Sequence, residues 1–301
     1  MRLYLGIDGG QSGTTALIGD ETGRVIGAGH AGPCNHVGAS ERRAKFFSAV
    51  GDSVRMAAEQ AGVTAKFTAV CAGFSGGGAD KDALTRELIQ AEHYCITHDA
   101  HIALAGATAG APGMIIIAGT GSIAYGRNAA GVTARAGGWG YVFGDEGGAF
   151  DLVRQSLRAI LRHEEGWGHP TELRATLLAA TNSASANELL HRCYTADYPR
   201  ERVAQLAPLV DQAARAGDPV ACSIIDGAAQ TLAMLTAAVQ RQLFGEDEPA
   251  NVHYIGGVFA SEPLLMRFRM LTELSGTTHV LAPIHSPAQG ALIEATRLPI
   301  R

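Results

Sequence analysis

Short apolar runs that end in glycine and hydroxyl residues characterise the first part of the chain. This pattern predicts buried strands at residues 3–7, 16–18 and 24–28. The first two strands flank the sequence DGGQSGTT at residues 8–15, so this loop joins a strand to a strand. Apolar positions at helical spacing then predict a helix over residues 40–61.

Strands and helices alternate in the segment that follows. In order, we expect a strand at residues 67–72, a helix at 80–91, a strand at 93–98 and a helix at 101–109. Asp99 stands between the last strand and the last helix, where it is expected to cap the helix. The sequence GAPG at residues 110–113 is typical of a domain boundary.

The opening pattern then recurs. An apolar strand at residues 114–118 runs into the sequence GTGS at residues 119–122, and a strand follows at residues 123–127. Two strand–loop–strand units predict an internal duplication. The rest is mainly helical: helices are expected at 149–163, 170–180, 186–194, 200–216, 219–243 and 288–297, and a strand at 251–255.

Charge and composition exclude several classes of protein. The net charge is −5 and no basic cluster exceeds Arg42-Arg43, so we expect no nucleic-acid partner. No apolar run approaches the roughly 18 residues of a membrane span, and the first run is too short for a signal peptide. The 5 cysteines show no CxxC spacing and the histidines no HExxH motif. These features predict a cytoplasmic protein without a disulfide framework or zinc site. Several arginines lie on predicted helix faces, where we expect them to be solvated.

Glycine is over-represented, with 38 of 301 residues against a usual share of roughly 7%. Sixteen of these glycines fall in short segments, at residues 8–15, 75–78, 119–122, 137–148 and 255–258. Glycine allows a backbone to approach a ligand closely. The segments therefore predict ligand-binding loops.

The two strand–loop–strand turns have the composition of phosphate-binding loops. Their glycines expose backbone N–H groups, and Ser12, Thr14 and Thr120 add hydroxyl donors. Asp8, at the end of its strand, is placed to face a cation that bridges phosphates. Neither a Walker A motif nor a dinucleotide fingerprint is present. An ordinary hairpin turn is the alternative for each loop.

Three further features indicate a sugar site. Asp99, at a strand end, is placed to accept a proton from an alcohol that attacks phosphorus, with helix capping as the alternative. In the sequence GGWG…GDEG, Asp145 offers an acceptor for sugar hydroxyls. Trp139 either stacks on a sugar ring or anchors the loop in the core. Asn35 offers an amide, with a surface turn as its alternative.

The set DGGxxxT, Asp99-Ala, GTGS and GGWG…GDEG resembles the BadF/BcrA-type ATPase family of the actin/hexokinase/Hsp70 superfamily, and within it N-acetylglucosamine kinases. The resemblance implies an α/β fold of two RNase H-like (actin-like ATPase) domains with an interdomain cleft. It places the N-terminal domain at residues 1–112 plus 288–301 and the C-terminal domain at residues 113–287. It also implies ATP and Mg²⁺ as cofactors and a homodimer.

Site residues follow from the same resemblance. Asp99 would take the proton from the sugar 6-hydroxyl and Asp8 would face the metal. The implied sugar-binding residues are Asn35, Asp99, Gly138, Trp139, Gly140 and Asp145. The implied ATP-binding residues are Gly10, Ser12, Gly13, Thr14, Thr120, Gly121, Ala204, Gly256 and Gly257. Many members read GGGTKT where this chain reads GGQSGTT, which leaves open the hydroxyl that contacts phosphate.

Alternative functions remain at this point. Glucosamine and N-acetylmuramate are alternative sugars for the same chemistry. An ATPase that activates a 2-hydroxyacyl-CoA dehydratase would need cysteines for an iron–sulfur cluster, and none stands beside the glycine segments. A non-catalytic sugar sensor would not need the base Asp99.

Overall fold

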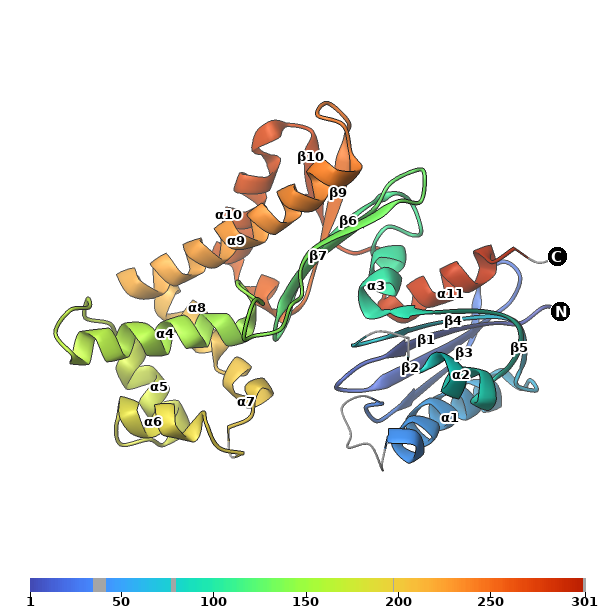
Figure 1. Ribbon diagram of the computed structural model, residues 1–301, viewed down its shortest axis with the longest axis horizontal. Helices are drawn as coiled ribbons and strands as arrows, with labels where there is room; N and C mark the ends of the chain where they lie inside the picture. Colours follow the sequence, from blue (N-terminus) through green and yellow to red (C-terminus); the bar gives the residue numbers. More distant parts are fainter. Residues whose placement is uncertain (35–41, 77–79, 197, 300–301) are drawn as a thin grey trace. The chain divides into compact units, whose positions relative to one another are not determined.

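In the computed structural model the chain forms two compact units (Figure 1). The structure describes residues 1–34, 42–76, 80–196 and 198–299. The first unit contains Met1–Pro112 and Pro283–Arg301, and the second contains Gly113–Ala282. The last segment of the chain thus returns to the unit that the first segment forms.

The first unit contains a five-stranded sheet in the order β3-β2-β1-β4-β5. Its strands are β1 (Tyr4–Gly9), β2 (Thr14–Gly19), β3 (Val25–Ala31), β4 (Lys66–Phe74) and β5 (Gln90–His98). β2 is antiparallel to β1 and β3, whereas β1, β4 and β5 are parallel. The loop DGGQSGTT is therefore the turn of a hairpin, as its flanking strands predict.

Helices cover both faces of this sheet because its central strands are apolar on both sides. Leu5 and Ile7 of β1 belong to the same hydrophobic cluster as Phe46 of α1 (Arg42–Ala61). Tyr4 belongs to a second cluster with residues of α3 (Asp99–Ala107) and α11 (Pro287–Arg297). The ribbon shows α1 on one face, α3 and α11 on the other, and α2 (Asp82–Leu88) near α1 (Figure 1).

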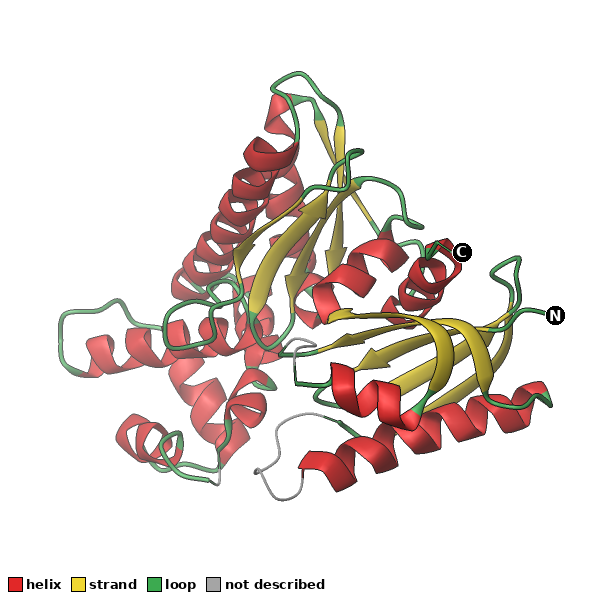
Figure 2. Ribbon diagram, turned by 45° about the vertical axis from the view of Figure 1, so that its right-hand side comes forward, coloured by secondary structure: helices red, strands yellow, loops and turns green. Residues whose placement is uncertain are grey.

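The second unit repeats this topology. Its strands are β6 (Gly113–Ala118), β7 (Ser122–Arg127), β8 (Thr133–Gly137), β9 (Ala250–Ile255) and β10 (Thr278–Leu281). The order β8-β7-β6-β9-β10 has the same succession of antiparallel and parallel pairs as β3-β2-β1-β4-β5. The predicted duplication is thus visible in the two sheets (Figure 2).

Most of the helices belong to the second unit. They are α4 (Ala149–Glu164), α5 (Leu173–Thr181), α6 (Ala186–Arg192), α7 (Arg200–Ala204), α8 (Ala207–Arg215), α9 (Pro219–Leu243) and α10 (Glu262–Thr272). Short 3₁₀ turns occupy Gly257–Ala260 and Glu273–Ser275. α9 packs along the sheet through Leu232 and Val239, which belong to one large core cluster with Met114 of β6.

The helix α9 has the length and mean hydropathy of a membrane span, alone among the helices of the described residues. One of its faces is buried in the protein, through residues that include Ala221, Ile225 and Leu232. Such a one-sided burial is typical of a core helix in a soluble protein.

Several expected elements differ from the structure. The single helix predicted at residues 200–216 is two helices, because Pro208 lacks the N–H that an unbroken helix would use. The helix predicted at 80–91 ends at Leu88, and β5 begins at Gln90. β8, α10 and β10 were not predicted, because their patterns in the sequence are short or interrupted.

Candidate active site

The first predicted phosphate loop is the tight turn between β1 and β2. The Gly10 amide donates to the Gly13 carbonyl at 2.8 Å and closes the turn. Asp8 lies in register with Thr15 of β2 and Gly73 of β4, at the end of the central strand. The turn thus joins the carboxylate and the glycines that the sequence predicts for metal and phosphate.

The hydroxyls of this loop differ in their surroundings. Thr14 is buried and its Oγ1 donates to the Gly32 carbonyl at 2.9 Å. Thr15 Oγ1 lies 3.1 Å from His30 Nδ1. Ser12 is exposed at the tip. Ser12 is therefore the hydroxyl best placed to meet a phosphate, whereas Thr14 would first have to leave its carbonyl partner.

Asp99 is the first residue of α3. The expectation that it caps this helix is wrong, because the N-cap is His98, whose Nδ1 accepts from the His101 amide at 3.2 Å. The Asp99 carboxylate instead accepts from the Ala100 amide through Oδ1 and from the Ser75 hydroxyl through Oδ2, both at 2.8 Å. Its side chain is thus oriented from the neighbouring strand.

Ser75 opens the glycine segment 75–78, which was predicted to be a ligand-binding loop, but it was not itself predicted as a site residue. It follows Phe74, the last residue of β4, and Phe74 lies in register with His98 of β5. Ser75 and Asp99 are therefore neighbours at the carboxyl ends of two parallel strands, where ligands of open α/β sheets bind. The parallel pairing of these strands is the signal that would have indicated Ser75.

Asp8 and Asp99 interact electrostatically. Burial and the negative charge of Asp99 raise the pKa of Asp8 from 3.8 to about 6. Two carboxylates in this relation stabilise a cation or a proton. Mg²⁺ usually binds proteins through one or two carboxylates together with substrate phosphates, so Asp8 suits this ion. The described residues contain no group of three or more ligands that could hold a metal alone.

The second predicted phosphate loop, residues 119–122, is the turn between β6 and β7. The first turn of α4 braces it, because the Ala149 and Phe150 amides donate to the carbonyls of Gly119 and Thr120. The Ser122 hydroxyl donates to the Glu146 carbonyl at 2.5 Å. The loop is thus tied on both sides to the segment that contains GDEG.

The glycine-rich segment 137–148 exposes its tryptophan. Trp139 is 66% exposed, so the alternative in which it anchors the loop in the core is wrong. The Arg135 guanidinium lies 4.4 Å from its ring. Gly138 and Gly140, on either side, have φ of +72° and +79°, a conformation that favours glycine. The exposed ring is in a position to stack on a sugar.

Asp145 forms an ion pair with Arg200 of α7. The expectation that arginines on helix faces are solvated fails for Arg200, whose guanidinium packs 5.2 Å from the Tyr141 ring. Asp145 itself is buried and has φ of +64°. No spacing rule links residues 55 positions apart, so the sequence could not indicate this pair.

The residues predicted near the nucleoside also lie in the second unit. Ala204 is buried at the end of α7. Gly256, after β9, has φ of +112°, and a Cβ there would overlap the Ala118 carbonyl oxygen. Gly257 has open space at its Cβ position. Asn35, predicted to contact the sugar, lies outside the described residues.

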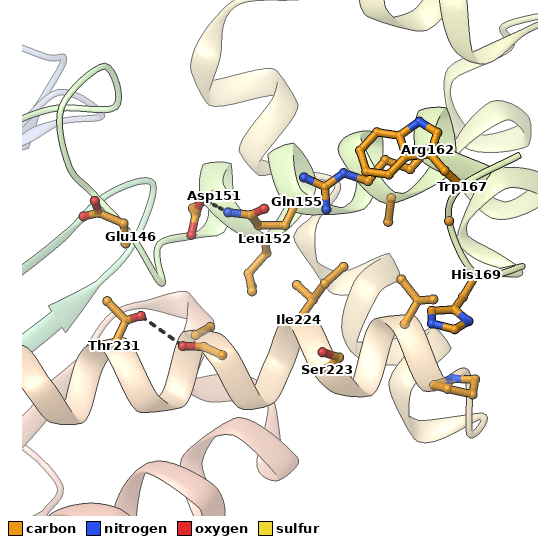
Figure 3. A pocket seen from close by; sticks show the side chains of 16 residues that line it. Glu146, Asp151, Leu152, Gln155, Arg162, Trp167, His169, Ser223, Ile224 and Thr231 are labelled. Atoms are coloured by element: carbon orange, nitrogen blue, oxygen red, sulfur yellow. Dashed lines mark hydrogen bonds between the residues drawn. The ribbon is translucent and has the colours of Figure 1, made fainter. Parts of the chain in front are cut away.

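A pocket of about 790 Å³ lies between α4 and α9 (Figure 3). It contains none of the predicted sugar or ATP residues. Asp151 lines it and accepts from the Gly147 amide at 3.0 Å, so this wall supports the GDEG segment. The pocket is therefore adjacent to the candidate site but separate from it.

A comparison with protein families decides the assignment. The sequence model of the BadF/BadG/BcrA/BcrD ATPase family matches residues 5–295. The chain belongs to this family. ATP is therefore its co-substrate.

Two curated relatives cover nearly the whole chain. An N-acetylmuramic acid/N-acetylglucosamine kinase from Clostridium acetobutylicum is 30% identical, with 98% of each chain covered. An N-acetyl-D-glucosamine kinase from Dictyostelium discoideum is 29% identical, with 97% of each chain covered. The similarity therefore extends through both units.

A solved structure supports the fold. A proposed N-acetylglucosamine kinase from Chromobacterium violaceum superposes with a TM-score of 0.77 at 26% identity, covering 97% of this chain and 98% of that chain. The fold class is α/β with two RNase H-like, actin-like ATPase domains, as predicted.

Proposed function

We propose that this protein is an ATP-dependent kinase that transfers the γ-phosphoryl group to the 6-hydroxyl of an amino sugar, N-acetylglucosamine first. The observation that carries the proposal is the position of the Asp99 carboxylate at the end of β5. This carboxylate accepts a hydrogen bond from Ser75 and does not cap α3. A carboxylate in this role accepts the proton of the attacking alcohol. The names of the two relatives support the same substrate class.

The first unit supplies the base and one phosphate loop. Asp99 removes the 6-hydroxyl proton, while Ser75 keeps one oxygen of its carboxylate fixed. Ser12 and Gly13 present hydroxyl and amide donors to phosphate oxygens, and Thr14 joins them if it leaves Gly32. Gly10 shapes this loop, because its own amide closes the turn on the Gly13 carbonyl. Catalysis in such enzymes is mainly positioning with charge neutralisation.

The second unit supplies the other phosphate loop and the sugar loop. Thr120 and Gly121 bind phosphate, and Gly138, Trp139, Gly140 and Asp145 contact the sugar. Ala204, Gly256 and Gly257 lie against the nucleoside, and Asn35 adds an amide to the sugar site. The exposed indole of Trp139 supports this assignment because it is open to a ring face.

Mg²⁺ is the proposed metal cofactor, and Asp8 is its protein ligand. When bound, this ion neutralises charge on the phosphates of ATP. The raised pKa of Asp8 supports the assignment, since a nearby cation would relieve the repulsion between Asp8 and Asp99.

Further parts of the assignment rest on the family resemblance. The two compact units divide at residues 112–113 and 282–283, so the second boundary lies five residues before the 287–288 expected from the sequence. We place the reaction in the cytoplasm. We also propose a homodimer, which light scattering coupled to size exclusion would test. A mass equal to a single 31.3 kDa chain would refute the dimer.

A panel of sugars tests the function. Wild-type protein with ATP and Mg²⁺ is expected to release ADP in response to N-acetylglucosamine, with glucosamine and N-acetylmuramate as the alternatives. A protein without sugar-dependent ADP release across hexoses and amino sugars would be a sensor rather than a kinase. A brown, iron-containing protein would instead indicate the dehydratase activator.

A further inference from the structure

The ion pair between Arg200 and Asp145 joins α7 to the GDEG segment. Arg200 Nη2 donates to Asp145 Oδ2. Asp145 is 6% exposed and has φ of +64°, a backbone conformation that few residues other than glycine adopt. The pair therefore helps to hold a strained, buried carboxylate in place.

The same guanidinium lies against the second phosphate loop. A Cβ on Gly121 would stand 2.8 Å from Arg200 Nη2 and would overlap the Asp145 carboxyl carbon. Only glycine leaves room for the pair at this position. Arg200 Nη2 thus lies next to both the proposed phosphate loop and the carboxylate of Asp145, which is proposed to bind the sugar.

The hydrogen-bonding capacity of Arg200 is largely unused. Asp145 is the one acceptor that the described residues offer it, and its Nε is buried without a partner. The rings of Tyr141 and Phe150 lie 5.2 and 6.0 Å from Cζ. These rings orient the guanidinium without occupying its N–H groups. A guanidinium with several unused donors is suited to two-point binding of a phosphate.

We propose that Arg200 is a further ATP-binding residue, which exchanges the Asp145 carboxylate for phosphate oxygens at residues 119–122 when ATP binds. The exchange leaves Asp145 available to accept hydrogen bonds from sugar hydroxyls. This inference rests on the proposed function and adds a link between its two substrates. Since such coupling is reciprocal, ATP and the sugar each strengthen the binding of the other.

Calorimetric titrations test the exchange. AMPPNP with Mg²⁺ and N-acetylglucosamine are titrated separately and together into wild type, Arg200→Ala and Arg202→Ala. In wild type each ligand is expected to tighten the other by about fivefold or more. Arg200→Ala is expected to weaken AMPPNP binding by about tenfold and to abolish the coupling. Arg202, on the same helix, stacks on Tyr198 and serves as the control.

The affinities for AMPPNP and N-acetylglucosamine, together with the coupling between the two ligands, distinguish a binding role of Arg200 from a structural one. If Arg200 were purely structural, Arg200→Ala would bind both ligands more weakly, but each ligand would still tighten binding of the other as in wild type. This result would overturn the proposal. Wild-type affinity for AMPPNP in Arg200→Ala, or no coupling in wild type, would also overturn it. Arg200→Lys keeps the charge without the two-point geometry. If Arg200→Ala does not fold, Arg200→Lys provides the test. Coupling in Arg200→Lys equal to that in wild type would refute the exchange.

The titration with AMPPNP alone does not depend on the sugar. If wild type releases no ADP with any sugar, the proposed kinase function fails, whatever Arg200 does. If wild type is a kinase but Arg200→Ala binds AMPPNP normally, the kinase function stands and the role of Arg200 fails.

Discussion

The Ser75 hydroxyl donates a 2.8 Å hydrogen bond to Oδ2 of Asp99, across the ends of two parallel strands. Lys81 Nζ donates to the Ser75 carbonyl oxygen at 3.5 Å. The carboxylate proposed as base is thus oriented by a residue of the adjacent strand, and the strand register fixes the distance between them.

Replacing Ser75 by alanine is expected to slow phosphoryl transfer. Hydrogen bonds to charged groups contribute about 1.5–3 kcal/mol, so kcat should fall about tenfold or more. The KM for sugar should change little, because the hydroxyl acts on the base. Steady-state kinetics of Ser75→Ala with Ser48→Ala as the control checks this. An unchanged kcat would show that Ser75 does not position Asp99.

Asp8→Asn is expected to stabilise the metal-free protein while abolishing activity. Between pH 3.8 and about 6 the folded chain retains the Asp8 proton that the unfolded chain loses, so stability falls as the pH rises. A shift of this size corresponds to about 3 kcal/mol at pH 7. Measured by urea unfolding in EDTA, the free energy of unfolding should fall as the pH rises across this range, and Asp8→Asn should reduce this fall.

Asp20 provides the control of opposite sign for this measurement. A hydrogen bond from the Thr22 hydroxyl lowers the pKa of Asp20. Stability linked to Asp20 is therefore present at neutral pH and lost as the pH falls through its lowered pKa. Asp20→Asn should destabilise the protein at pH 7. A gain in stability from Asp20→Asn, or none from Asp8→Asn, would contradict the electrostatic account.

Trp139→Ala is expected to weaken sugar binding without loss of stability. Stacking of this kind contributes about 0.5–1.5 kcal/mol, so the sugar KM should rise about 2- to 13-fold. The melting temperature should stay unchanged, because the side chain is 66% exposed. Sugar kinetics and thermal unfolding of the variant decide the matter. A large drop in melting temperature would mean that the ring is structural.

Gly121→Ala is expected to damage the second phosphate loop. The added Cβ would overlap the Asp145 carboxyl group and displace it from Arg200. Affinity for AMPPNP and for sugar should both fall by about tenfold or more. Gly227→Ala is the matched control, because nothing lies within 4 Å of its Cβ position and alanine favours helix. If Gly121→Ala and Gly227→Ala bind AMPPNP and sugar with equal affinity, the close packing around Gly121 is not needed for ligand binding.

Local sequence patterns were sufficient for much of this fold. The two glycine hairpins and the helix α9 follow from hydrophobic periodicity and turn chemistry. β8, with the sequence TARAG, has little apolar pattern and owes its place to pairing with β7. Such tertiary pairing cannot be seen in a short segment.

The site was predictable only where its residues stand in motifs. Asp99 and Asp145 lie in recognisable segments, whereas Ser75 and Arg200 act through partners distant in sequence. Trp139 was equally compatible with a core or a surface position until its exposure was known. The sequence motifs therefore indicate the type of reaction, and the fold determines which side chains orient the reacting groups.

The most direct test of the proposed function is Asp99→Asn. The amide keeps the size of the side chain and its acceptor oxygen but cannot take the 6-hydroxyl proton. Sugar binding and ADP release should be measured on the same preparation. Asp99→Asn should bind N-acetylglucosamine about as tightly as wild type and should have lost phosphoryl transfer. Transfer at the wild-type rate by Asp99→Asn would contradict the role of Asp99 as the base.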